Sequence, residues 1–221
     1  MAQARHKVSK DRPRSVTIGP MQLEGSLVVP EPVAGLVIFA HGSGSSRLSP
    51  RNTYVAGQLQ RRFMATLLFD LLTEEEASDR RNVFHVPLLA SRLEEAVSWA
   101  CCDPETAALP IGLFGASTGS AAALVAAAAN SEVAAVVSRG GRPDLAAHVL
   151  TEVRAPTLLI VGGADTGVLE LNQEAFAKLN CVKALRIVPG ATHLFEEPGA
   201  LDEVVKAAGD WFDTHLRQAQ R

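Results

Sequence analysis

The chain has 221 residues, of which 47% are hydrophobic and 20% charged, with a formal net charge of −3. This composition is typical of a globular chain with a sizeable core, and the lack of a basic excess argues against nucleic acid as a main partner. Because it has no membrane-length apolar run, no secretory signal and only three cysteines without zinc-type spacing, we expect a cytoplasmic protein that contacts no membrane.

Residues 1–14 are predicted to be a flexible N-terminal arm, and residues 15–221 a single domain. The arm concentrates basic side chains, which are Arg5, Lys7, Lys10, Arg12 and Arg14. Such a cluster suits an electrostatic anchor or a solvated tail, and we interpret it as the tail.

Beyond the arm, apolar runs typical of strands alternate with stretches of helical periodicity. The runs at 16–18 and 23–29 flank Gly19-Pro20 and predict a hairpin. Further strands are predicted at 35–40, 65–71, 111–114, 133–137, 156–161 and 184–188. Helices are predicted at 51–63, 87–101, 120–129, 143–153, 169–179 and 201–217, and the polar stretch 73–83 is expected to be a surface loop.

This alternation predicts an α/β fold with a mostly parallel sheet, helices on both faces and antiparallel strands at one edge. In such sheets the active crevice lies beyond the carboxyl ends of the strands. The stretch between the strands at 133–137 and 156–161 is too short for a substantial lid, so we expect an open site.

The pentapeptide Gly115-Ala116-Ser117-Thr118-Gly119 lies between a predicted strand and a predicted helix. A G-x-S-x-G sequence in this context describes a nucleophile elbow, whose sharp turn presents the serine hydroxyl above the sheet. The pattern also occurs by chance in glycine-rich turns, so its context has to decide between the two interpretations.

Two further residues follow strands in the order that a Ser–Asp–His triad requires. Asp165 comes directly after the strand at 156–161, and His193 lies in the loop after the strand at 184–188. Ser117, Asp165 and His193 are therefore predicted to be catalytic, with His193 as the base and Asp165 as its orienting acid. Asp144, after an earlier strand, is the rival acid, but we interpret it as the cap of the next helix.

The loop after the strand at 35–40 is rich in glycine and serine and can turn its backbone amides toward the crevice. The Ser43 and Thr118 N–H groups are predicted to form an oxyanion hole. His41 is expected to orient this loop rather than to react.

Substrate contacts are predicted for four residues around the crevice, which are Gly42, Gly44, Arg139 and Arg142. The two arginines are candidates for an anionic substrate group, although pairing with nearby acids would also account for them. The Glu196-Glu197 pair after His193 is interpreted as a solvated cap.

As a set, six segments are similar to the α/β-hydrolase fold and, within it, to the dienelactone hydrolase-like proteins. The segments are VIFAHGSGSSRLSPRN (37–52), FDLLTEEE (69–76), IGLFGASTGSAAAL (111–124), VVSRGGRPDLA (136–146), APTLLIVGGAD (155–165) and VPGATHLFEEPG (188–199). The resemblance implies Ser117, Asp165 and His193 as the triad. Because true dienelactone hydrolases carry a cysteine nucleophile, Ser117 points to a broader carboxylesterase.

The sequence therefore predicts a carboxylic ester hydrolase that cleaves small acyl esters through an acyl-enzyme and needs no metal or other cofactor. A lactone hydrolase of dienelactone type, an acyltransferase and a non-catalytic binding module remain alternatives. A small-molecule ester is the expected partner, and the chain is expected to be a monomer or a homodimer.

Overall fold

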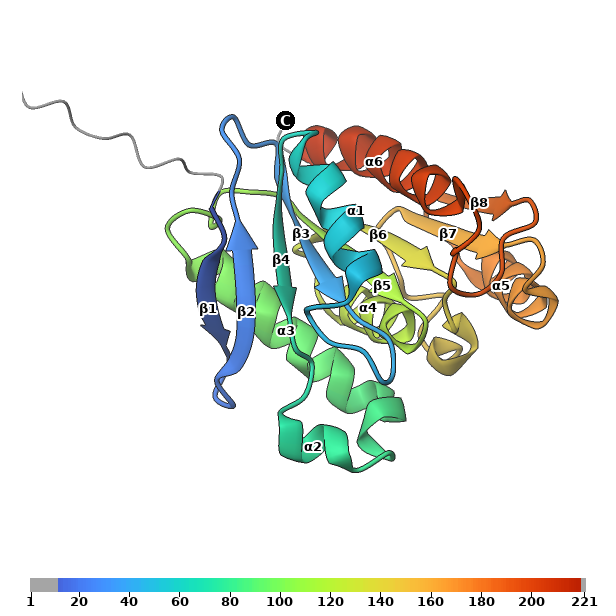
Figure 1. The fold of residues 1–221 in the computed structure, drawn as a ribbon, viewed down its shortest axis with the longest axis horizontal. Coiled ribbons are helices and arrows are strands. Elements are labelled where there is room, and N and C mark those ends of the chain that lie inside the picture. Colours follow the sequence, from blue (N-terminus) through green and yellow to red (C-terminus); the bar gives the residue numbers. More distant parts are fainter. Residues whose placement is uncertain (1–11, 220–221) are drawn as a thin grey trace, which may run out of the picture.

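Eight strands form one mixed sheet in the computed structural model, which describes residues 12–219 (Figure 1). The basic residues of the predicted arm up to Lys10 lie outside this range. The spatial order of the strands is β1-β2-β4-β3-β5-β6-β7-β8. Their bounds are β1 (Arg14–Ile18), β2 (Leu23–Val28), β3 (Gly35–Ala40), β4 (Met64–Phe69), β5 (Ile111–Ala116), β6 (Val133–Arg139), β7 (Thr157–Gly162) and β8 (Lys183–Val188).

The sheet is parallel from β4 to β8, and β1 and β2 add an antiparallel hairpin at one edge. The predicted hairpin and the mostly parallel sheet are thus confirmed. Arg14, expected in the flexible arm, begins β1, and its guanidinium pairs with Asp103 and Glu105. These ion pairs join the edge strand to the segment that follows helix α3 (Val86–Cys102).

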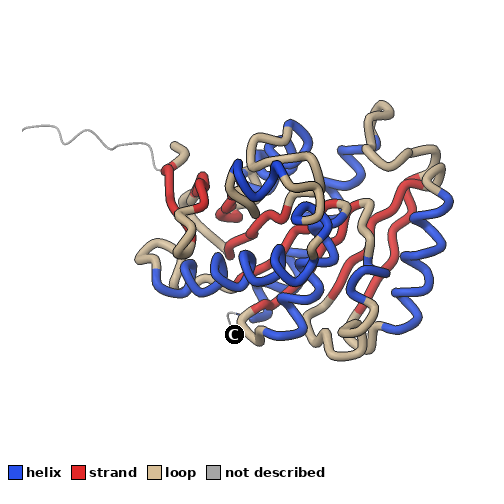
Figure 2. The backbone as a smooth tube through the Cα atoms, turned by 90° about the horizontal axis from the view of Figure 1, so that it is seen from below, coloured by secondary structure: helices blue, strands red, loops and turns tan. Residues whose placement is uncertain are grey.

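Helices cover both faces of the sheet, so that the strands form the middle layer (Figure 2). The α-helices are α1 (Pro50–Gln60), α2 (Glu74–Ser78), α3, α4 (Thr118–Ala129), α5 (Thr166–Lys178) and α6 (Ala200–Ala219). Helices α1 and α6 pack on one face, and α3, α4 and α5 pack on the other. No helix within residues 12–219 combines the length and the apolar character that crossing a membrane requires.

Strand β3 shows why the sequence folds this way. All six of its residues are buried, because helices lie on both sides of it. Leu36 and Ile38 belong to the core on the α3–α4 face, whereas Val37 and Phe39 belong to the core on the α1–α6 face. The continuous apolar run is thus two alternating faces, each covered by a helical layer.

Two predicted segments differ in the structure. The expected surface loop at 73–83 contains α2 and a short 3-10 helix, η1 (Asn82–Phe84). Thr73 and Glu76 form a reciprocal capping box that stabilises α2, and this local signal was hidden in an acidic run. The expected helix at 143–153 shortens to a 3-10 turn, η2 (Pro143–Ala146).

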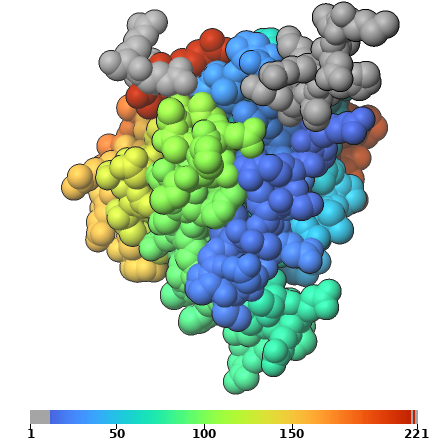
Figure 3. All heavy atoms as spheres, turned by 90° about the vertical axis from the view of Figure 1, so that its left-hand side faces the viewer, coloured from blue at the N-terminus to red at the C-terminus, as the bar shows by residue number. Residues whose placement is uncertain are grey.

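Helix α2 follows β4 and projects from the body of the molecule (Figures 1 and 3). It lies beyond the end at which the parallel strands finish, which is where an active crevice is expected. The connection from β6 to β7 contains only η2 as regular structure, in agreement with the expectation that it forms no large lid.

Candidate active site

Ser117 lies at the turn between β5 and α4, with a φ of 51° and a ψ of −120°. A positive φ is unusual for a residue other than glycine and is maintained only where the surroundings impose it. A Cβ atom on Gly115 would lie 2.4 Å from the Ser120 Cα atom, and one on Gly119 would lie 2.3 Å from the Ala40 carbonyl oxygen. The glycines of the pentapeptide are therefore required by close backbone contacts, as in a nucleophile elbow.

His193 joins Ser117 to Asp165 by hydrogen bonds. Its Nδ1 atom lies 2.7 Å from Asp165 Oδ2, and its Nε2 atom lies 3.3 Å from Ser117 Oγ. A carboxylate accepts only, so Nδ1 carries the proton and Nε2 is left to accept from the Ser117 hydroxyl. The structure brings together the three side chains that the sequence singled out, joined by two successive hydrogen bonds.

Asp165 begins α5 without capping it. Its backbone occupies the N-cap position, but its side chain makes no hydrogen bond to the first turn of the helix. The carboxylate is instead directed to His193, as the sequence predicted. Because a capping carboxylate would be occupied by backbone amides, this arrangement leaves Asp165 available to orient the imidazole.

The loop that carries His193 is fastened to the loop that carries Asp165. The Ala164 N–H donates to the Ala191 carbonyl at 2.9 Å. The Glu197 carboxylate accepts from both the N–H and the hydroxyl of Thr192, at 3.1 and 2.6 Å, which lowers the pKa of Glu197. Glu197, interpreted from the sequence as part of a solvated cap, therefore positions the residue next to His193.

The predicted oxyanion hole is only partly arranged. As the first residue of α4, Thr118 has an N–H with no acceptor inside the helix. The Ser43 N–H, however, donates to Thr118 Oγ1 at 2.9 Å. The Ser43 N–H can therefore donate to a substrate oxygen only if its hydrogen bond to Thr118 Oγ1 is shared or broken. The sequence did not predict this hydrogen bond.

His41 supports the loop before Ser43. The Leu71 N–H donates to His41 Nε2 at 3.1 Å, which leaves Nδ1 protonated to donate to the Gly42 carbonyl at 3.0 Å. Burial lowers the pKa of His41, so the ring is neutral near pH 7. Both ring nitrogens are used on backbone groups, in keeping with an orienting role.

A cavity of about 210 Å³ opens over Ser117, and we call it the serine cavity. It is lined by Gly42, Ser43, Ser45, Ser49, Arg51, Asn52, Ala116, Ser117, Arg139, His193 and Leu194. Of the four predicted substrate contacts, Gly42 and Arg139 lie in it.

Gly44 lines a neighbouring cavity instead. Arg142 is not among the residues that line the serine cavity, and its guanidinium forms two hydrogen bonds with Asp144, at 2.8 and 2.7 Å. The prediction that Arg142 binds substrate is therefore not supported by its position, and the interpretation of Asp144 as a helix cap gives way to this ion pair.

Arg139 is a buried cation without an acidic partner within residues 12–219. Its exposed fraction is 6%, its Nη2 lies 3.4 Å from Asn52 Oδ1, and its Nε has no hydrogen bond. Burial lowers its pKa to about 10, helped by the positive charge of Arg51 in the same cavity, so it remains charged at neutral pH. A buried charge is expensive unless it is paired, which makes the serine cavity receptive to an anion.

Sequence reasoning missed Arg51 and Asn52 as residues of this cavity. Both lie at the start of α1, whose N-cap is Ser49. Arg51 also pairs with Glu196 at 3.0 Å, across the mouth of the site. No motif marks these residues, although the stretch 43–52 as a whole follows a strand that ends at the crevice.

Comparisons with known proteins point to one family. The family model described as "Dienelactone hydrolase family" matches residues 63–217. The solved structure of a dienelactone hydrolase from Anabaena variabilis superposes with a TM-score of 0.90 and 55% sequence identity, covering 93% of this chain and 98% of that one. Est1E from Butyrivibrio proteoclasticus, at 15% identity and a TM-score of 0.77 over 92% of this chain and 98% of that one, shares the fold.

A curated relative carries a different name. A Mycobacterium tuberculosis protein named "Putative phosphoribosyl transferase" is 59% identical over 208 residues, which are 94% of this chain and 47% of that protein. The chain therefore spans about half the length of the curated relatives it matches.

Proposed function

This chain belongs to the dienelactone hydrolase family, with the α/β-hydrolase fold, and from this premise we propose that it hydrolyses small carboxylic esters through an acyl-enzyme on Ser117. The observation that carries the proposal is the hydrogen-bonded series from Ser117 through His193 to Asp165, at the carboxyl ends of the parallel strands. The strained backbone of Ser117 supports it, because such strain is maintained where function requires it.

In the proposed first step the Ser117 oxygen attacks the ester carbonyl carbon while its proton passes to His193 Nε2. The carbonyl electron pair moves onto the oxygen, whose negative charge is stabilised by the Thr118 N–H and by the Ser43 N–H once Thr118 Oγ1 releases it. Asp165 stabilises the imidazolium that forms.

Collapse of this intermediate breaks the bond to the alcohol oxygen, which takes the proton from His193 Nε2. The acyl group remains on Ser117 as an ester. A water molecule then attacks the acyl carbon while its proton passes to His193 Nε2. The second intermediate collapses by breaking the bond to Ser117 Oγ, which takes this proton back, and the carboxylic acid is released. Besides the substrate and this water molecule, the proposed cycle uses only groups of this chain.

We further propose that Arg139 binds an anionic group of the substrate. Its side chain is buried beside Ser117 in the serine cavity, and within the described part of the chain no carboxylate pairs with it. Arg51 lines the same cavity, but its charge is paired with Glu196, so Arg139 is the cation left for an anionic group. A carboxylate would pair with a guanidinium in the geometry that arginine favours.

Replacing Arg139 with Met should lower the preference for a carboxylated ester over its neutral counterpart by about 10- to 100-fold, the usual contribution of a hydrogen bond to a charged group. The pair 3-carboxy-4-nitrophenyl acetate and 4-nitrophenyl acetate measures this as a ratio of kcat/KM values. Arg142→Met is the matched control, because Arg142 is paired with Asp144 and is not among the residues that line the cavity. If the ratio of kcat/KM values is unchanged in Arg139→Met, Arg139 does not bind the anionic group of the substrate.

Lactones are the second substrate class, because a lactone is a cyclic ester and the same steps open it. The similarity to a structure named as a dienelactone hydrolase favours this class. We propose no phosphoribosyl transfer, since this chain matches only 47% of the relative with that name and itself belongs to a hydrolase family. Product analysis distinguishes the remaining alternatives from hydrolysis. Acyl transfer gives an acylated acceptor in place of the free acid, and a binding role without turnover gives no product.

The proposed function is tested by pre-steady-state hydrolysis of 4-nitrophenyl acetate, followed by a panel of lactones. We expect a burst of about one nitrophenolate per active site, followed by slower turnover, because acylation and deacylation are separate steps. A fluorophosphonate probe should label the folded protein at Ser117. Folded protein that shows neither burst nor labelling would be a binding module instead.

A further inference from the structure

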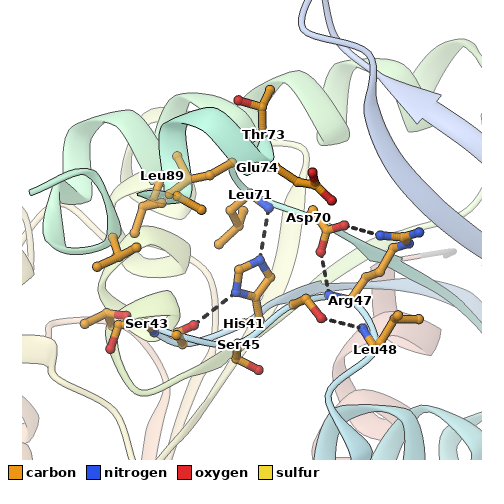
Figure 4. A pocket seen from close by; sticks show the side chains of 17 residues that line it. His41, Ser43, Ser45, Arg47, Leu48, Asp70, Leu71, Thr73, Glu74 and Leu89 are labelled. Atoms are coloured by element: carbon orange, nitrogen blue, oxygen red, sulfur yellow. Dashed lines mark hydrogen bonds and ion pairs between the residues drawn. The ribbon is translucent and has the colours of Figure 1, made fainter. Parts of the chain in front are cut away.

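A second cavity, of about 370 Å³, adjoins the serine cavity, and we call it the α2 cavity (Figure 4). Its volume is within the range of small-molecule sites. Gly42, Ser43 and Ser45 line both cavities, so the two cavities lie on either side of the loop at 41–46, which we call the oxyanion loop. Of the four predicted substrate contacts, Gly42 and Gly44 line the α2 cavity.

The interior of the α2 cavity is apolar. Six aliphatic side chains line it, which are Leu48, Leu71, Leu72, Ala77, Val83 and Leu89. Leu71, Leu72 and Leu89 are buried, whereas Leu48 and Ala77 are exposed, which places the mouth between the oxyanion loop and α2. Such a lining favours uncharged hydrocarbon groups.

The other charged groups around the α2 cavity have partners, whereas the exposed Glu74 side chain makes no hydrogen bond or ion pair within the described part of the chain. Arg47 pairs with Asp70 and with Glu24, and Figure 4 shows Asp70 turned toward Arg47. The neutral His41 ring is held by the Gly42 carbonyl and the Leu71 amide. Unlike the serine cavity, the α2 cavity therefore presents no buried, unpaired cation to a ligand.

Helix α2, which covers the α2 cavity, is held in place by several hydrogen bonds. Arg92, which is buried, donates to Glu76 at 2.9 Å, and Asn82 donates to the Glu76 carbonyl at 2.9 Å. Together with the capping box of Thr73 and Glu76, these contacts hold α2 above Leu89. The cavity is thus formed before a ligand binds, which lowers the entropic cost of binding.

The two cavities meet at the hydrogen bond between the Ser43 N–H and Thr118 Oγ1. Ser117 and His193 line only the serine cavity, and Thr118 lines only the α2 cavity. In the proposed mechanism the leaving oxygen must lie beside His193, so the alcohol part of an ester belongs to the serine cavity. The acyl part then extends away from His193, past Thr118 and into the α2 cavity.

We infer that the α2 cavity binds the acyl group of the substrate and selects an uncharged, apolar acyl chain of a few carbons. The inference rests on the proposed ester hydrolysis at Ser117 and adds the substrate class. The preferred substrate then combines an apolar acyl group in the α2 cavity with an anionic group near Arg139.

The test compares 4-nitrophenyl acetate, propanoate and butanoate. Each added methylene that enters an apolar site should raise kcat/KM about fourfold, so butanoate should exceed acetate by roughly 15-fold in the unmodified protein. Ala77→Trp places an indole at the mouth of the cavity and should reduce this ratio to about 3 or less. Ser78→Trp is the matched control, since Ser78 is the next residue of α2, is exposed and does not line the cavity.

Val83→Trp fills the cavity from another wall and gives a second variant if the indole at position 77 turns to solvent. A cooperative thermal unfolding transition serves as the check that each variant is folded. A butanoate-to-acetate ratio near 1 in the unmodified protein, or an equal ratio in Ala77→Trp, Val83→Trp and Ser78→Trp, would overturn the inference. A chain-length effect found only for the alcohol of alkyl acetates would assign the cavity to the leaving group. Absence of turnover and of probe labelling would instead refute ester hydrolysis, and the acyl assignment with it.

Discussion

Ser117→Ala is expected to lower kcat for 4-nitrophenyl ester hydrolysis by about 10⁴- to 10⁶-fold, the range found when the nucleophile of a serine hydrolase is removed. Within residues 12–219, Ser117 carries the only hydroxyl that is hydrogen-bonded to His193 Nε2, so no other nucleophile is activated by this base. The burst of nitrophenolate and labelling by a fluorophosphonate should disappear together.

Ser120→Ala is the matched control for this substitution. Ser120 lies three residues further along the chain and is buried, but its hydroxyl donates to the Ser117 carbonyl rather than meeting His193. We expect it to keep kcat within about tenfold, because it removes only two hydrogen bonds with the backbone, one to the Ser117 carbonyl and one from the Arg142 N–H. A Ser117→Ala protein that is as active as the unmodified one would refute the proposed mechanism.

Asp165→Asn is expected to lower kcat by about 10⁴-fold while the protein stays folded. An amide can donate to His193 Nδ1, which favours the tautomer with the proton on Nε2. That tautomer cannot accept the Ser117 proton. The hydrogen bonds at 2.7 Å and 3.3 Å in this structure both depend on the opposite tautomer.

Asp144→Asn provides the comparison, because Asp144 is the rival acid by sequence. Its carboxylate is paired with Arg142, which lowers the pKa of Asp144, and it makes no contact with His193. We expect a change in kcat of less than tenfold. If Asp144→Asn abolished activity and Asp165→Asn did not, the acid of the triad would be assigned wrongly. Pre-steady-state rates of both variants, with thermal unfolding as a check on folding, decide between them.

Much of the fold follows from local patterns. Runs such as that of β3 are apolar because both faces of the strand are covered, and the alternation of strands and helices leaves few ways to connect them. The short helix α2 was missed because its three glutamates resemble a solvated loop, and only the capping box of Thr73 and Glu76 marks it. Helices this short depend on tertiary contacts, here the pairing of Glu76 with Arg92.

The candidate triad was likewise visible in the sequence, because each residue lies in the connection after a parallel strand and the sheet brings those strand ends together. The sequence did not separate Arg139 from Arg142, which lie three residues apart. Only the folded chain places Arg139 in the serine cavity without an acid and gives Arg142 the carboxylate of Asp144.

The sheet, the candidate elbow and the order of Ser117, Asp165 and His193 could thus be predicted from the sequence. These features depend on hydrophobic periodicity and on residues adjacent to strand ends, which are local properties. The folded structure was needed to show which cations are unpaired, that the Ser43 N–H donates to Thr118 Oγ1, and where an apolar cavity lies. Those properties arise from side chains far apart in the chain, whose distances no local pattern encodes.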